Sequence, residues 1–181
     1  RACQVTVSAP AAQDPLIVAP ASLELLQQMP IFGGVKPPAL EVLLGSGRRV
    51  EVPAGSYFFR EQEPAQGLYV LEAGRVVVVK QWRNQSMQLR VLEPGDCFGE
   101  MALLDLFPRS ASVRALDDSR AFEITAADLL RLFEHDMEQF ALVQMNIARE
   151  MCRRLRETDE MLFEAVMGGQ APTTDTNFQA L

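Results

Sequence analysis

The chain has 181 residues, of which 48% are hydrophobic, and its formal net charge is −7. This composition is typical of one globular domain with a helical appendage, and it excludes a collagen-like, largely disordered or disulfide-stapled protein. Because the balance is acidic, the chain is a poor electrostatic match to a nucleic-acid backbone, and no nucleic-acid partner is expected.

The N-terminal part predicts a flexible arm followed by short helices. Residues 1–21 are rich in Ala and Pro, which is typical of a loose linker. Ser22 fits the N-cap of a short helix that Pro30 ends. A second short helix is predicted over residues 37–44, because proline is favoured in the first helical turn and a glycine follows.

The middle of the chain changes to short β-rich runs with turn residues between them. Runs this short and this evenly spaced indicate an all-β sandwich or barrel. The predicted strands cover residues 48–52, 56–60, 68–71, 76–82, 87–92, 111–116 and 120–124.

Helical character returns at Thr125, which forms a weak capping-box signal with Asp128. We divide the rest into a domain over residues 22–135, a long helix over 136–166 and a disordered tail over 167–181. Apolar residues recur along the long helix at steps of three, four and seven, so one face is apolar. They are Phe140, Val143, Ile147, Met151, Leu155, Leu162 and Val166.

The segment over residues 98–111 interrupts the strand series and has the parts of an anion site. Gly99 allows close backbone approach to a ligand, and the short helix after it presents free N–H groups. Arg109 offers a planar fork of donors suited to phosphate, and Ser110 adds a hydroxyl. Glu100 could accept hydrogen bonds from sugar hydroxyls. The alternative is an ordinary ion pair between Glu100 and Arg109.

This string, Phe-Gly-Glu-Met-Ala-Leu followed by Pro-Arg-Ser-Ala, resembles the phosphate-binding cassette of cyclic-nucleotide-binding domains. That family includes the bacterial catabolite activator protein and regulatory subunits of cyclic-AMP-dependent protein kinase. The residues 67–74 and the turn at 94–96 are similar to further signatures of the family. The resemblance implies an α+β fold: a β-roll or jelly roll of about eight antiparallel strands, with N-terminal helices and a long C-terminal helix.

The resemblance also implies roles for residues of the segment 98–111, called the cassette below. Glu100 would bind the ribose 2′-hydroxyl, and Arg109 with Ser110 would bind the cyclic phosphate. Backbone amides along the stretch from Gly99 through Met101 to Ala102 would complete the phosphate site. No other cofactor is expected.

The preference between bases rests on three further positions. Ala111 stands where a Thr or Ser tends to favour cyclic GMP in the kinase branch, so the resemblance favours cyclic AMP. Thr158 and Asp159 are similar in position to a Thr-Ser pair that contacts the base in the bacterial activator, although Asp replaces the Ser. The alternative is a polar pair that sets the register of a helix dimer.

We therefore expect a regulatory sensor that binds a cyclic nucleotide, with a preference for cyclic AMP, and passes the signal through its long helix. The apolar stripe of that helix predicts a homodimer. Two alternatives stay open: the sensor half of a truncated activator-type transcription factor, and a ligand-free interaction scaffold. No triad, metal cluster or Walker loop points to an enzyme.

The remaining reactive residues favour ordinary structural roles. The three cysteines are far apart without a CxxC pair, which indicates no metal or disulfide framework and makes a reducing cytoplasm the simplest compartment. His135 is expected at the surface and Cys97 inside a strand. Arginines over residues 149–156 alternate with acids, which is typical of a solvated, salt-bridged face. No apolar run is long enough for a membrane helix.

Overall fold

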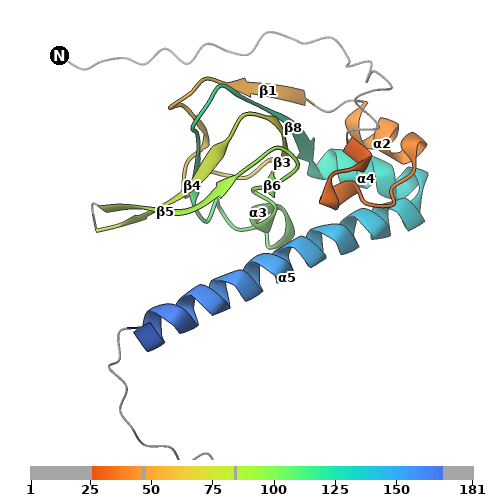
Figure 1. Ribbon diagram of the computed structural model, residues 1–181. Helices are drawn as coiled ribbons and strands as arrows, with labels where there is room; N and C mark the ends of the chain where they lie inside the picture. Colours follow the sequence, from red (N-terminus) through yellow and green to blue (C-terminus); the bar gives the residue numbers. More distant parts are fainter. Residues whose placement is uncertain (1–25, 46–47, 84, 169–181) are drawn as a thin grey trace, which may run out of the picture.

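The computed structural model describes residues 26–45, 48–83 and 85–168, which form a two-sheet β-roll with short helices at one end and one long helix running along it (Figure 1). The arm predicted over 1–21 lies outside the described residues. The predicted tail does too, except that Met167 and Gly168 still belong to the long helix, which therefore ends later than expected.

The described part of the chain contains eight strands, all paired antiparallel, so the predicted fold class is confirmed. Seven of them follow the β-rich runs of the sequence. The eighth has only two residues, too few for a period to be recognised, and it pairs with a neighbour through Val70↔Cys97 and Tyr69↔Phe98. The strands are β1 (Arg48–Val52), β2 (Tyr57–Phe59), β3 (Gly67–Ala73), β4 (Val76–Trp82), β5 (Gln85–Leu92), β6 (Cys97–Phe98), β7 (Ser112–Ala115) and β8 (Ser119–Thr125).

Local signals set the helix boundaries. The predicted capping box is present, because the Thr125 side chain accepts from the Asp128 N–H at 3.3 Å and the Asp128 carboxylate accepts from the Thr125 N–H at 2.7 Å. Pro30 opens a 3₁₀ turn after the first helical residues, and Pro37 opens the next helix. The described helices are η1 (Pro30–Phe32), α2 (Pro37–Leu44), α3 (Met101–Leu104), α4 (Ala126–His135) and α5 (Met137–Gly168).

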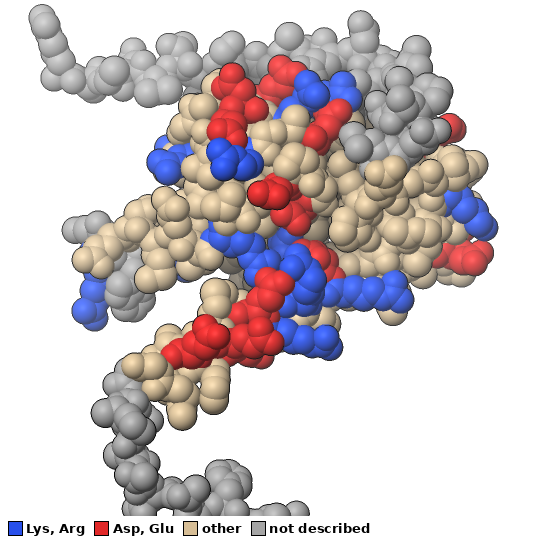
Figure 2. All heavy atoms as spheres, in the orientation of Figure 1, with Lys and Arg blue, Asp and Glu red and all other residues tan. Residues whose placement is uncertain are grey.

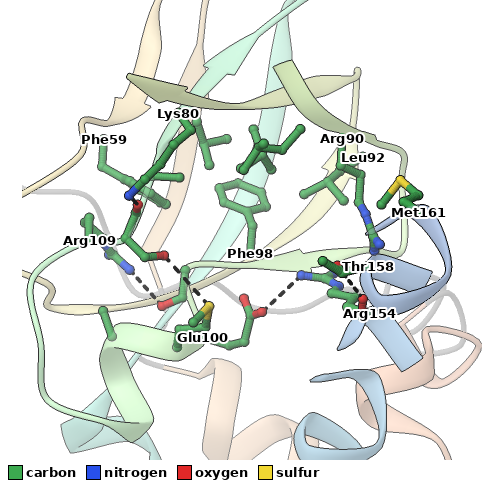
Figure 3. Close-up of a pocket in the computed structure, with 18 residues that line it drawn as sticks. Phe59, Lys80, Arg90, Leu92, Phe98, Glu100, Arg109, Arg154, Thr158 and Met161 are labelled. Atoms are coloured by element: carbon green, nitrogen blue, oxygen red, sulfur yellow. Dashed lines mark hydrogen bonds and ion pairs between the residues drawn. The ribbon is translucent and has the colours of Figure 1, made fainter. Parts of the chain in front are cut away.

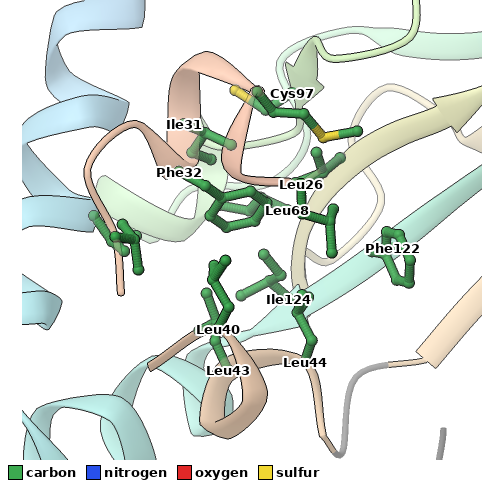
Figure 4. Packing of buried hydrophobic residues seen from close by; sticks show 14 of the residues in the cluster. Leu26, Ile31, Phe32, Leu40, Leu43, Leu44, Leu68, Cys97, Phe122 and Ile124 are labelled. Carbon is green, nitrogen blue, oxygen red and sulfur yellow. The ribbon is translucent and has the colours of Figure 1, made fainter. Parts of the chain in front are cut away.

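The two sheets have the strand orders β1-β8-β3-β6 and β2-β7-β4-β5. Successive side chains of a strand point to opposite faces, and β3 uses both faces. Leu68 and Val70 pack into a core shared with the helices, whereas Tyr69 and Leu71 pack into a core between the sheets. Figure 4 shows the helical core, where Phe32 from η1 lies among side chains of α2 and β3.

Helix α5 has a buried first half and an exposed second half. Val143 and Ile147 are buried against the helical core, and the Asn146 side-chain amide donates to the carbonyls of Ile31 and Gly33 at 3.2 and 3.0 Å. Further along, the stripe residues Leu155, Leu162 and Val166 are exposed. The helix is therefore anchored at the helical end of the molecule, and its second half runs alongside the β-roll (Figure 1).

Candidate functional site

Gly99 begins the cassette in a conformation that only glycine adopts without strain. Its φ is +79°, and a Cβ built on it would lie 2.4 Å from Arg109 Nη1. The backbone then enters α3, with Glu100 as its N-cap. Since the first N–H groups of a helix have no partner within the helix, the amides of Met101 and Ala102 are left without a partner inside α3. Ala102 is buried, whereas Met101 is half exposed.

Arg109 crosses the cassette and is 3% exposed. Its guanidinium donates to the carbonyls of Gly99 and Gly67, each at 2.8 Å, and lies 4.0 Å from the centre of the Phe59 ring. No carboxylate pairs with it in the described part of the chain, and its buried Nε has no hydrogen-bond partner there. Burial accordingly lowers the pKa of Arg109 from its ordinary value. The arrangement leaves a buried cation whose charge an anionic ligand would offset.

Glu100 pairs with the long helix and not with Arg109, so the ion pair weighed as the alternative is not formed. The Arg154 Nη1 donates to Glu100 Oε1 at 3.1 Å, and Arg154 Nη2 donates to the Cys97 carbonyl at 2.5 Å. Burial alone would lower the pKa of Arg154, but the charges of Glu100 and Glu150 raise it overall. Glu100 is itself buried, so this pair fastens α5 to the cassette.

The end of the cassette carries a second cation. Lys80 on β4 donates from Nζ to the Ser110 carbonyl at 2.5 Å, and the same ammonium pairs with Glu61 Oε1 at 2.6 Å. Ser110 is exposed, and its hydroxyl contacts the sulfur of Met101 at 3.8 Å. Ala111, which follows Ser110, is buried and immediately precedes β7.

These groups surround a pocket of about 450 Å³ between the cassette and α5 (Figure 3). Its floor is apolar and comes from the core between the sheets, including Phe98, Leu92 and Val113. Its other walls come from three elements besides the cassette, which contribute Lys80 from β4, Leu89 and Arg90 from β5, and Arg154, Thr158 and Met161 from α5.

The structure brings most of the predicted site residues together. Gly99, Glu100, Met101, Ala102, Arg109, Ser110 and Ala111 all line the pocket, and so does Thr158 from the opposite side. The Thr158 hydroxyl donates to the Arg154 carbonyl at 2.8 Å. Asp159 is exposed and does not line the pocket.

Several lining residues were not identified from the sequence. Lys80 directly follows four valines within β4, and a charged residue after such an apolar run could have marked it. Arg154 was interpreted as part of a solvated face. The salt bridges of Arg153 and Arg154 with Glu150 are present, but the Arg154 side chain is only 17% exposed and reaches the pocket. Arg90 carried no local signal, since its role depends on α5.

The other residues weighed have ordinary structural roles. His135 is exposed at the end of α4. Cys97 is buried in the helical core, and burial raises the pKa of its thiol to about 12, so it stays protonated. In the described ranges, no group of residues is arranged to hold a metal ion, and no helix is long and apolar enough to cross a membrane.

Comparison with known proteins identifies relatives of this arrangement. Residues 49–136 match the family described as "Cyclic nucleotide-binding domain". The "Cyclic AMP receptor protein" of Thermus thermophilus is 34% identical over 131 residues, which are 72% of this chain and 59% of that protein. A "cAMP-dependent protein kinase regulatory subunit" of Emericella nidulans is 30% identical over 107 residues, covering 59% of this chain and 26% of the relative.

A solved structure shares the fold. The crystal structure of the Thermus thermophilus catabolite activator protein superimposes with a TM-score of 0.66 at 33% identity, covering 76% of this chain and 63% of that one. The chain spans about three fifths of the length of the Thermus receptor protein. The cassette and the two-sheet roll are both consistent with the family match over residues 49–136. Through these residues the chain belongs to the cyclic nucleotide-binding domain family.

Proposed function

We propose that this chain is a regulatory sensor that binds a cyclic nucleotide, with a preference for cyclic AMP, in the pocket between the cassette and α5. The observation that carries the proposal is that the cassette and α5 line one pocket together. A ligand held there would touch the anion-binding loop and the long helix at once. Cyclic GMP is the alternative ligand. The relatives named above are regulatory proteins by name, and we infer no catalytic activity.

The charge of the site supports a ligand with a single phosphate. A cyclic phosphate carries one negative charge, which would offset the buried charge of Arg109. The Ser110 hydroxyl and the amides of Met101 and Ala102 would supply further donors. Glu100 Oε2 accepts no hydrogen bond within the described residues, so this oxygen is available to a ribose 2′-hydroxyl.

The contacts of Arg154 offer a route for the signal. Arg154 joins α5 to Glu100 and to the Cys97 carbonyl beside it. A ribose that engages Glu100 would act directly on this fastening and so change how strongly the second half of α5 is held. We infer that the position of α5 is the output of the sensor.

The proposal is tested by titrating the purified protein with cyclic AMP and cyclic GMP in a calorimeter. We expect saturable one-site binding with higher affinity for cyclic AMP. A pocket that takes up neither nucleotide would identify the chain as the ligand-free scaffold. Tighter binding of cyclic GMP would still support a cyclic-nucleotide sensor, but one that prefers guanine to adenine.

Thr158→Val is expected to weaken cyclic AMP binding by about fivefold, which corresponds to about 1 kcal/mol for one neutral hydrogen bond. Thr158 lines the pocket from α5, and its hydroxyl oxygen can accept from the exocyclic amine of adenine. The preference over cyclic GMP should fall as well. Asp159→Asn is the matched control, because Asp159 does not line the pocket. Calorimetry on both variants measures the change in affinity. An equal loss of cyclic AMP affinity in both would indicate that Asp159 also contacts the base.

The exposed half of α5 is expected to pair with a second copy of the chain. Leu155, Leu162 and Val166 are each more than half exposed and lie on one helical stripe. A two-fold helix pair is the common way to cover such a stripe. Light scattering at micromolar concentration should report a dimer, and Leu162→Glu should shift it toward monomer. A monomeric wild type, with and without nucleotide, would rule the dimer out.

A second candidate function is the sensor part of an activator-type transcription factor. It is favoured by the catabolite activator protein among the structural relatives, of which this chain covers 63%. The absence of a nucleic-acid partner therefore stays a prediction about this chain alone. Sequencing the native gene product, followed by a gel shift on its full length, would decide between the two candidates.

A further inference from the structure

An ion pair lies at the end of the pocket that is away from Arg109, where Arg90 lines the pocket. Arg90 on β5 and Glu157 on α5 form this pair through Nη2 and Oε2. Figure 3 shows Arg90 together with Thr158 and Met161 at one end, while Arg109 and Lys80 lie at the other. If the cassette holds the sugar and phosphate, the base of a bound nucleotide extends toward Arg90.

Arg90 by itself would be well suited to guanine. A guanidinium fork matches the two adjacent acceptors of guanine, O6 and N7, whereas adenine places an amino donor beside N7. The Arg90 side chain is 22% exposed and lines the pocket, so it lies within reach of a base. Its partner in the described ranges is Glu157.

Glu157 is oriented from two sides. Its Oε2 accepts from Arg90, and its Oε1 accepts from Arg153, one turn earlier on α5. Arg153 is in turn held by both carboxylate oxygens of Glu150, at 3.0 and 2.6 Å. Because Arg153 already orients the carboxylate, its pairing with Arg90 costs little further ordering. Figure 2 shows these charges gathered along α5 beside the β-roll.

We propose that Glu157 sets the base selectivity of the pocket by engaging Arg90 and so withholding its donors from guanine. The inference rests on the proposed function, because it requires a cyclic nucleotide in this pocket. The pair leaves the base end without net charge, and Leu89 and Met161 add apolar surface there. Adenine, which has fewer polar groups to satisfy than guanine, is then the preferred base.

The test is a double-mutant cycle on Glu157 and Arg90 with cyclic AMP and cyclic GMP as separate titrants. Glu157→Ala frees Arg90, and we expect cyclic GMP affinity to rise about tenfold while cyclic AMP affinity changes far less. Adding Arg90→Gln to that variant should abolish the gain. Glu160→Ala is the matched control, since it removes an exposed carboxylate of the same helix that does not pair with Arg90 within the described residues.

Each outcome decides the proposal. An unchanged ratio of the two affinities in Glu157→Ala would overturn it, and so would weaker cyclic GMP binding, which would mean that Glu157 itself reads guanine. A gain that survives Arg90→Gln would also contradict it. Thermal unfolding checks that each variant is folded, and Glu157→Gln replaces Glu157→Ala if that variant is not. Failure of the proposed function looks different, because the wild-type protein would then bind neither nucleotide.

Discussion

Arg109→Ala is expected to weaken cyclic AMP binding by about 10- to 150-fold, which corresponds to about 1.5–3 kcal/mol for a lost hydrogen bond to a charged group. The variant removes the buried cation of the pocket, which has no carboxylate partner in the described part of the chain. The phosphate would then keep only neutral donors and the Lys80 ammonium, which is already paired with Glu61. Calorimetric titration of wild type and variant measures the loss.

The same side chain also supports the fold, so stability must be measured separately. Arg109 donates to the Gly99 and Gly67 carbonyls, and its removal leaves both without these bonds. Arg109→Lys keeps a charge but not the planar fork, and we expect it to bind with intermediate affinity. Arg120→Ala is the control, because Arg120 pairs with Glu72 away from the pocket. Equal affinity of wild type and folded Arg109→Ala protein would refute the assignment of the phosphate site.

Gly99→Ala is expected to reduce nucleotide binding by at least about tenfold, by displacing Arg109. The new Cβ would lie 2.4 Å from Arg109 Nη1 and 3.2 Å from Phe59 Cε1, so the guanidinium has to move. The backbone at φ +79° adds a strain of about 1–2 kcal/mol for a residue with a Cβ. Calorimetry reports the loss of affinity, and thermal unfolding without ligand reports the strain.

Gly95 provides a matched control for this variant. It also has a positive φ, +101°, but a Cβ there would meet no atom within 4 Å. Gly95→Ala should therefore share the backbone strain and retain nucleotide affinity. If both variants lost affinity to the same extent, the loss would come from the strained backbone of the roll and not from the displaced Arg109.

Much of the fold could be predicted because its signals are local. The apolar run of β3, the proline that opens α2 and the capping box of Thr125 each act over a few neighbouring residues. Strand β6 could not be predicted in this way, because two residues define no period and only pairing with β3 makes Cys97 and Phe98 a strand.

The sequence by itself determined the cassette, since Gly99, Glu100, Arg109 and Ser110 lie within one segment whose order of residue types identifies an anion site. Only the tertiary structure decided what faces it. Arg154 and Arg90 lie 54 and 67 residues from their partners Glu100 and Glu157, and nothing local distinguishes either from a solvated arginine. Their roles arise because the first half of α5 packs on the helical core, which directs its second half across the mouth of the pocket. Contacts between distant segments depend on packing that no short window of sequence contains.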